Sequence, residues 1–183
     1  MDNIFAVAVD GNAIHPHELI TVAEKKPDFL PQATLVRSGD RSAILYSKND
    51  LIPFSAYGER QEGIDLGIIF TMLSGYLRCL IEARDRMLNT SLVSSDPEKG
   101  VFVIRQGNVI RIKALWGMDT LPDEKDKICR IIAVLSKRDR VMGAGESMKR
   151  MIEIIRSGNP SLKTCLAEAE KVSREWNRIV QPN

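Results

Sequence analysis

Three residues of this 183-residue chain have side chains of the kind that hydrolytic chemistry uses: Asp10, His15 and Asp65. Asp10 follows a short apolar run at residues 5–9, and a carboxylate at the end of a strand is a common first ligand of a metal-dependent phosphoesterase. His15 stands two residues before His17, and an imidazole can act as a general base near neutral pH. These three are the catalytic candidates, and Asp10 with Asp65 would build a metal-dependent hydrolase.

The surroundings of these residues favour a structural role for each. Asp10 begins the triplet Asp-Gly-Asn, in which glycine allows a positive φ angle and Asx side chains stabilise a turn. Two-metal chemistry needs three or more converging carboxylates, and no later predicted strand ends in an acidic cluster. No third orienting group accompanies His15 and His17, which we interpret as a solvated pair at the start of a helix. We therefore predict no metal site and no cofactor.

Two segments resemble a known family. The stretch VAVDGNAI, at residues 7–14, resembles the opening strand of PIN-related NYN nucleases. The stretch EGIDLGI, at residues 62–68, resembles their second acidic segment, with Asp65 at the start of a helix. The resemblance implies a metal-dependent nuclease built on Asp10 and Asp65, although the two segments are closer together here than in that family.

The elements that must position these residues follow the order β-α-ββ-α-ββ-ααα. Apolar and alternating runs predict a strand at 4–9 and hairpins at 33–47 and 101–115. Apolar residues at helical spacing predict helices at 15–26, 63–88, 122–137, 145–157 and 160–180. This order predicts an α+β fold with one antiparallel sheet of about five strands, a long central helix on one face and three C-terminal helices. We expect residues 1–120 to form the sheet-and-helix domain and residues 121–183 to pack on the same core.

The predicted helix at 63–88 carries more apolar surface than a five-stranded sheet needs. Between residues 63 and 77 only Asp65 is charged, so this half is apolar on nearly every side. Such a helix is either enclosed by its own fold or pressed against a second copy of the chain. For the second alternative, the expected interface residues are Ile64, Ile68, Met72 and Trp176.

Basic residues suggest nucleic acid as an alternative partner. They lie on the second hairpin and around the connection between the predicted helices at 122–137 and 145–157: Arg105, Arg111, Lys113, Lys137, Arg138, Arg140, Lys149 and Arg150. If they converge, they form a surface that follows a phosphate backbone. Aromatic residues make up only 5% of the chain, so platforms for base stacking are scarce, and a solvated charged face is the interpretation we favour.

Composition limits the class of protein. The chain is 44% hydrophobic and 27% charged, as globular domains are, and no apolar run reaches the roughly 20 residues that span a bilayer. Three widely spaced cysteines predict buried free thiols and a reducing, cytoplasmic location without a membrane partner. The sequence thus predicts a non-enzymatic protein-interaction module, such as an adaptor, regulatory subunit or immunity-like protein. It would bind another protein or itself as a homodimer.

Overall fold

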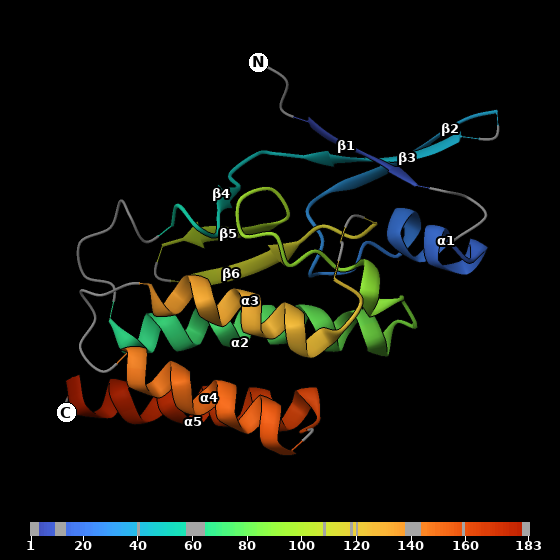
Figure 1. Ribbon diagram of the computed structural model, residues 1–183. Helices are drawn as coiled ribbons and strands as arrows, with labels where there is room; N and C mark the ends of the chain where they lie inside the picture. Colours follow the sequence, from blue (N-terminus) through green and yellow to red (C-terminus); the bar gives the residue numbers. More distant parts are fainter. Residues whose placement is uncertain are drawn as a thin grey trace.

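The computed structural model describes residues 4–9, 14–39, 41–57, 65–107, 109–117, 119, 121–137, 144–158 and 160–180. These residues confirm the α+β class (Figure 1). The strands are β1 (Ile4–Val9), β2 (Ala33–Ser38), β3 (Arg41–Ser47), β4 (Ile52–Pro53), β5 (Val101–Gln106) and β6 (Val109–Ala114). The helices are α1 (Pro16–Glu24), α2 (Leu66–Asp85), the short 3-10 helix η1 (Thr90–Leu92), α3 (Glu124–Ser136), α4 (Ala144–Gly158) and α5 (Leu162–Val180).

The described strands form two antiparallel sheets of three strands each, so the prediction of one sheet of about five strands was wrong in this respect. Both predicted hairpins form, but each takes its third strand from a different segment: the order is β1-β3-β2 in one sheet and β4-β5-β6 in the other. The strand β4 has only two residues and ends at Pro53, which has no N–H for further pairing. The hydropathy pattern identifies a strand but not the strand that pairs with it. The division of the strands into two sheets could therefore not be predicted from the sequence.

The two sheets meet at a buried pair of aromatic residues. The Tyr46 hydroxyl donates a hydrogen bond of 2.8 Å to the Trp116 carbonyl, and the Trp116 N–H donates to the same hydroxyl at 3.2 Å. Gly117 follows with a φ of 99°, and a Cβ there would lie 3.1 Å from a methyl carbon of Val9. A glycine is therefore required where the chain leaves this junction.

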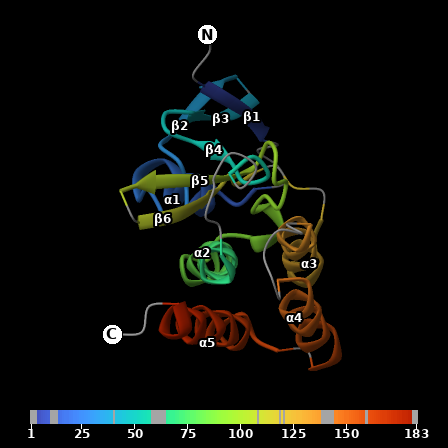
Figure 2. The same ribbon diagram turned by 90° about the vertical axis from the view of Figure 1, so that its left-hand side faces the viewer.

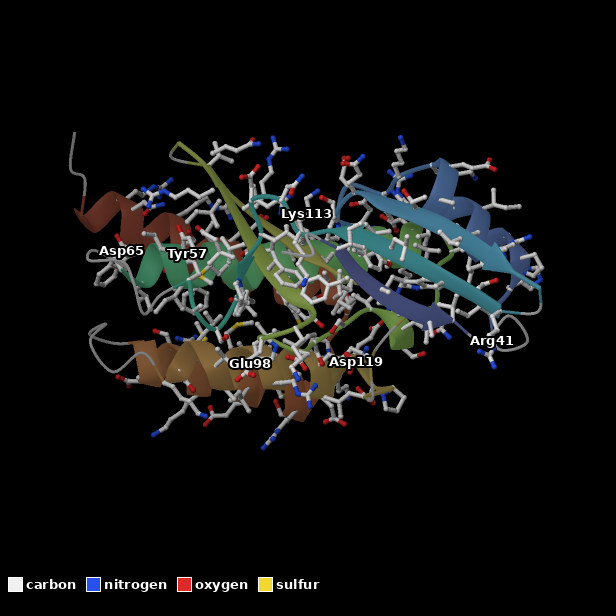
Figure 3. The ribbon with its side chains drawn as sticks, turned by 90° about the horizontal axis from the view of Figure 1, so that it is seen from above. Arg41, Tyr57, Asp65, Glu98, Lys113 and Asp119 are labelled. Atoms are coloured by element: carbon white, nitrogen blue, oxygen red, sulfur yellow. The ribbon has the colours of Figure 1, made fainter. Side chains whose placement is uncertain are left out.

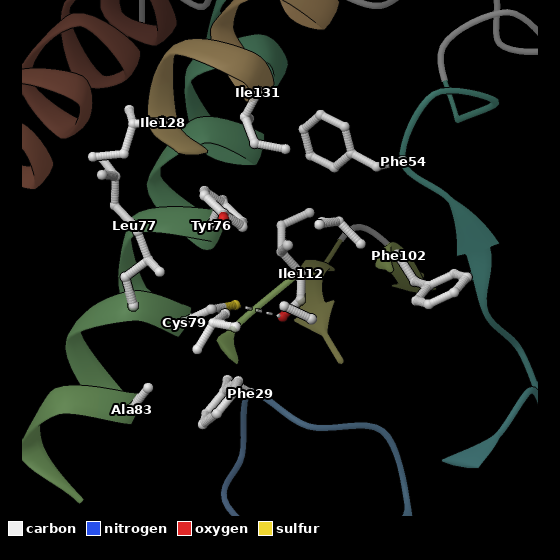
Figure 4. Packing of buried hydrophobic residues seen from close by; sticks show 14 of the residues in the cluster. Phe29, Phe54, Tyr76, Leu77, Cys79, Ala83, Phe102, Ile112, Ile128 and Ile131 are labelled. Atoms are coloured by element: carbon white, nitrogen blue, oxygen red, sulfur yellow. Dashed lines mark hydrogen bonds between the residues drawn. The ribbon is translucent and has the colours of Figure 1, made fainter. Parts of the chain in front are cut away.

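Helix α2 is the centre of the core. It begins after Asp65, whose side chain accepts a hydrogen bond from the Ile68 N–H at 2.8 Å, and it ends before Met87, which has a positive φ of 57°. Contrary to the expectation from the sequence, α2 is long and apolar enough to span a membrane by length and composition, but 67% of its apolar window is buried inside the fold. Figure 2 shows α2 enclosed by the β5–β6 hairpin, α3 and α5, and Figure 4 shows the side chains packed around it.

Two glycines let other elements approach α2 closely. A Cβ at Gly75 would lie 2.4 Å from a side-chain carbon of Ile112 on β6. A Cβ at Gly67 would lie 2.6 Å from the side chain of Asn177 on α5. The two contacts fix the sheet and the C-terminal helix on different sides of α2, and one continuous cluster of buried side chains runs from β1 to α5.

Candidate interaction surface

The sheet β1-β3-β2 has an uncovered apolar face. Because directly opposed residues of antiparallel strands point to the same side, the strand register assigns each side chain to a face. Val7, Val9, Ile44 and Tyr46 point inward and are buried. The other side, which we call the outer face, carries these described side chains: Ile4, Ala6 and Ala8 of β1, Thr34 and Val36 of β2, and Arg41, Ala43, Leu45 and Ser47 of β3.

The outer face is unusual in its chemistry. The solvent side of an antiparallel sheet is normally polar, with charged residues alternating with the buried ones. Among the side chains that the structure describes on this face, six of nine are apolar and Arg41 is the one charged residue. Ile4 and Val36 are 53% and 43% exposed. Apolar side chains gathered on an exposed sheet face make it a candidate interaction site.

No described element covers this face. In Figures 1 and 2 the sheet lies at the top of the molecule, with α1 and the second sheet beneath it and no described helix or strand above. Figure 3 looks down on the outer face and shows Arg41 at the end of the β2–β3 hairpin. The charge therefore stands at one end of the face and leaves its centre apolar.

The interface residues expected on α2 and α5 lie elsewhere. Met72 is completely buried, so it cannot contact a partner, and the prediction for this residue was wrong. Ile68 is half-buried against the core, Trp176 is half-buried where α5 approaches Gly67 of α2, and Ile64 is outside the described residues. Within the described chain, the apolar surplus of α2 is thus enclosed by its own fold.

Two of the catalytic candidates, Asp65 and His15, are not brought together. Asp65 uses its carboxylate to cap the start of α2. His15 caps α1, and the Nε2 atom of His17 lies 2.9 Å from the carbonyl oxygen of Met87, just beyond the other end of α2. A helix of 20 residues is about 30 Å long, which separates Asp65 from the histidines by roughly that distance.

Asp10 lies outside the described residues, so its predicted role stays a prediction. Val9, the last residue of β1, pairs with Ser42 beside Arg41, at the end of the molecule opposite Asp65 in Figure 3. Among the residues that the structure describes, no three His, Cys, Asp or Glu side chains come together as metal ligands.

The basic candidates form two separate groups. Arg105, Arg111 and Lys113 lie on the β5–β6 hairpin, whereas Lys137 caps the end of α3 and Lys149 and Arg150 lie on α4. Figure 2 places the hairpin and the pair of helices on different sides of α2. Lys113 donates to the carbonyl of Asp28 and Arg105 donates to that of Gly107, so both already have partners within the chain. Arg138 and Arg140 are outside the described residues.

One buried charged pair was missed by the sequence analysis. The Nζ atom of Lys127 lies 3.0 Å from Asp119, 2.7 Å from the Ser91 carbonyl and 2.5 Å from the Val93 carbonyl. The Lys127 side chain is 0% exposed and that of Asp119 is 2% exposed. The only sequence signal was the position of Lys127 four residues before Ile131, on the buried side of α3.

The environment of this pair indicates a structural role. Burial lowers the pKa of Lys127, against the opposing effect of Asp119. Burial alone would raise the pKa of Asp119, but hydrogen bonds from the Leu121 N–H, Lys127 and Ser95 together lower it below its ordinary value. All three protons of the Lys127 ammonium have acceptors within the chain. The pair therefore joins α3 to the segment around η1 and leaves no donor for a substrate.

Two grooves elsewhere contain charges of which several are already paired. The larger, about 610 Å³, lies between α2, β6 and Leu166 of α5. Its Arg78 forms an ion pair with Glu170, and its Glu82 accepts hydrogen bonds from the N–H groups of Asp28 and Phe29. The smaller, about 480 Å³, contains the ion pair between Arg84 and Glu124.

The three cysteines are free thiols, and we predict a clear order of reactivity. Cys79 is buried beside β6, where its Sγ lies 3.5 Å from the Ile112 carbonyl, and burial raises its pKa to about 12 (Figure 4). Burial also raises the pKa of Cys165. Since the thiolate is the reactive form, iodoacetamide at pH 8 should modify half-buried Cys129 first.

Mass spectrometry of peptides after timed labelling measures this order. Cys79 and Cys165 should reach the rate of Cys129 only when a denaturant is added. Labelling of native Cys79 as fast as Cys129 would contradict the packing of α2 against β6.

Comparison with known proteins adds no relative: no protein-family model, curated protein or solved structure matches this chain. The resemblance of residues 7–14 and 62–68 to NYN nucleases is therefore not supported by a family model. The function has to be argued from the surfaces themselves.

Proposed function

We propose that this chain is a non-enzymatic, cytoplasmic protein-interaction module that binds its partner through the outer face. The observation that carries the proposal is the apolar composition of that face, with Arg41 as the one charge among its described side chains and no described element above it. Three free cysteines support a reducing location. Asp65 lies far from the histidines, so these residues do not form a shared catalytic site.

The energetics favour association at this face over its exposure to water. Apolar surface removed from water contributes about 25 cal/mol per Å², and a protein partner is the usual means of covering such a patch. Arg41 at one end adds specificity, because a partner that places a carboxylate there gains a charge-assisted hydrogen bond. A partner protein with an apolar surface and an acidic residue at its margin fits these features.

Replacing Val36 with glutamate should abolish partner binding. The carboxylate would be buried without a counter-charge in the complex, which costs more than the 1.4 kcal/mol that equals a tenfold loss of affinity. Val109→Glu is the matched control, because Val109 is also an exposed valine on a strand, in the other sheet. Immobilised wild type, V36E and V109E are compared by quantitative mass spectrometry of proteins retained from a lysate of the source cells.

The expected result is a set of proteins retained by wild type and V109E but depleted more than about tenfold on V36E. Equal retention by V36E would show that the outer face is not the contact surface. Circular dichroism melting of both variants verifies that each is folded.

Nucleic acid is the second candidate partner, because Arg111, Lys149 and Arg150 are exposed. A nucleic-acid complex would be lost when the lysate is treated with nuclease, and its affinity would fall steeply with salt. It would also weaken in an Arg111→Ala or Lys149→Ala variant while V36E has no effect. The same experiment with these treatments therefore separates the two functions.

A further inference from the structure

The strand β1 is an open sheet edge. It pairs with β3 on one side, and no described strand pairs with its other side. The Ser47 N–H donates to the Gln32 carbonyl, so the odd-numbered residues of β3 face β2. In an antiparallel ladder the hydrogen-bonded positions alternate, so the even-numbered residues of β3 face β1. By the strand register, the N–H and C=O groups of Ile4, Ala6 and Ala8 then point away from the sheet.

The other long edges of the described sheets are protected. The β2 edge carries Arg37, and α1 packs beside this strand. The β6 edge carries Arg111, and its Ala114 N–H already donates to the Phe29 carbonyl. Charged edge residues and covered edges are the devices by which proteins prevent edge-to-edge pairing. The six residues of β1, IFAVAV, contain neither a charge nor a proline.

We infer that a second copy of this chain pairs with β1, antiparallel and about a two-fold axis at Ala6, to form one six-stranded sheet. In this register Ile4 lies opposite Ala8, and Ala6 lies opposite its own counterpart. All of these residues have outward amides, so the pairing forms about six hydrogen bonds. The absence of charge from β1 matters for a two-fold contact, because any charge on the axis would face itself.

The size of the outer face gives a reason for the second copy. Three strands of six residues cover about 14 Å by 20 Å, or roughly 280 Å², from ordinary strand spacings. Each partner in a standard protein interface buries about 800 Å². A two-fold axis perpendicular to the sheet places both outer faces on the same side and raises the footprint to roughly 560 Å², closer to the standard size. This part of the inference rests on the proposed function, because it assumes that the outer face binds a partner and that the face of one copy is too small to do so alone.

Replacing Ala6 with proline tests the pairing directly. The substitution removes an outward N–H but none of the bonds to β3, and proline is tolerated on an edge strand in that orientation. Ala6→Ser is the matched control, because it keeps the N–H. In sedimentation velocity at micromolar concentration, wild type and A6S should be dimers and A6P a monomer with an unchanged circular dichroism spectrum.

Hydrogen exchange of the wild type gives an independent measurement if A6P fails to fold. The amides of Ala6 and Ala8 should be protected in the dimer and exchange roughly 100-fold faster on dilution to the monomer. A monomeric wild type, or a dimer in which the Ala6 and Ala8 amides exchange freely, would overturn the inference. V36E should stay dimeric while losing its partners. If wild type and V36E are both monomeric and V36E still loses the bound partners, the pairing of β1 is disproved. The proposed function is then still supported.

Discussion

Replacing Asp119 with alanine should lower the free energy of unfolding by about 3–5 kcal/mol, the usual cost of breaking a buried ion pair from one side. The variant leaves the Lys127 ammonium completely buried with two carbonyls but no counter-charge. It also removes the acceptor of the Ser95 N–H, at 2.6 Å, and of the Leu121 N–H. Urea denaturation followed by circular dichroism measures the change.

A double variant separates the charge from the packing. Lys127→Met combined with Asp119→Leu removes both charges and keeps apolar volume, and such replacements are often neutral or stabilising. We expect it to recover the part of the loss that comes from the buried Lys127 charge, but not the part that comes from the Ser95 and Leu121 N–H groups, which still lack their acceptor. A loss below about 1 kcal/mol in Asp119→Ala itself would show that the carboxylate is not required.

The pH dependence of stability gives a second measure of the same carboxylate. The pKa of Asp119 in the folded state is below its ordinary value of 3.8, so the unfolded chain binds a proton first as the pH falls. The contribution of Asp119 is therefore fully present above the ordinary value and is lost as the pH falls through the folded-state pKa. The difference in unfolding free energy between wild type and Asp119→Ala should shrink over that acidic range.

Replacing Trp116 with alanine should also lower the free energy of unfolding by about 3–5 kcal/mol, because it leaves a large cavity at the junction of the two sheets. The Trp116 side chain is completely buried, and its indole N–H donates to the Asn89 carbonyl at 3.1 Å. Thermal melting followed by circular dichroism measures the effect.

Tyr46→Phe is the narrower test of that junction. It removes one hydroxyl, which serves both the carbonyl and the N–H of Trp116, and should cost about 1–3 kcal/mol. A Tyr46→Phe variant as stable as wild type would mean that aromatic packing, rather than the hydrogen bonds, joins the sheets.

The long-range arrangement was less accessible from sequence than the elements. The apolar periodicity of α2 and the turns of both hairpins are local signals, and the structure contains these elements close to the expected positions. The partner of each hairpin depends on contacts between distant residues. For example, β4 pairs Ile52 with Val103, and no local pattern marks Ile52 as a strand residue.

The outer face was hidden for a related reason. The run IFAVAV is apolar at every position, so its pattern does not distinguish an inward side from an outward one. Such a run normally indicates a strand buried on both faces. Only the register with β3 shows that Ile4, Ala6 and Ala8 share the exposed side. The burial of Lys127 was not predicted for the opposite reason: a lysine in a helix is usually exposed to solvent.

The placement of the two tryptophans gives the chain two built-in optical reporters. Trp116 lies where the two sheets meet, and Trp176 lies where α5 approaches Gly67 of α2. Each indole thus samples a different joint of the molecule. Single-tryptophan versions of the chain would let fluorescence distinguish the release of the β1-β3-β2 sheet from the undocking of α5.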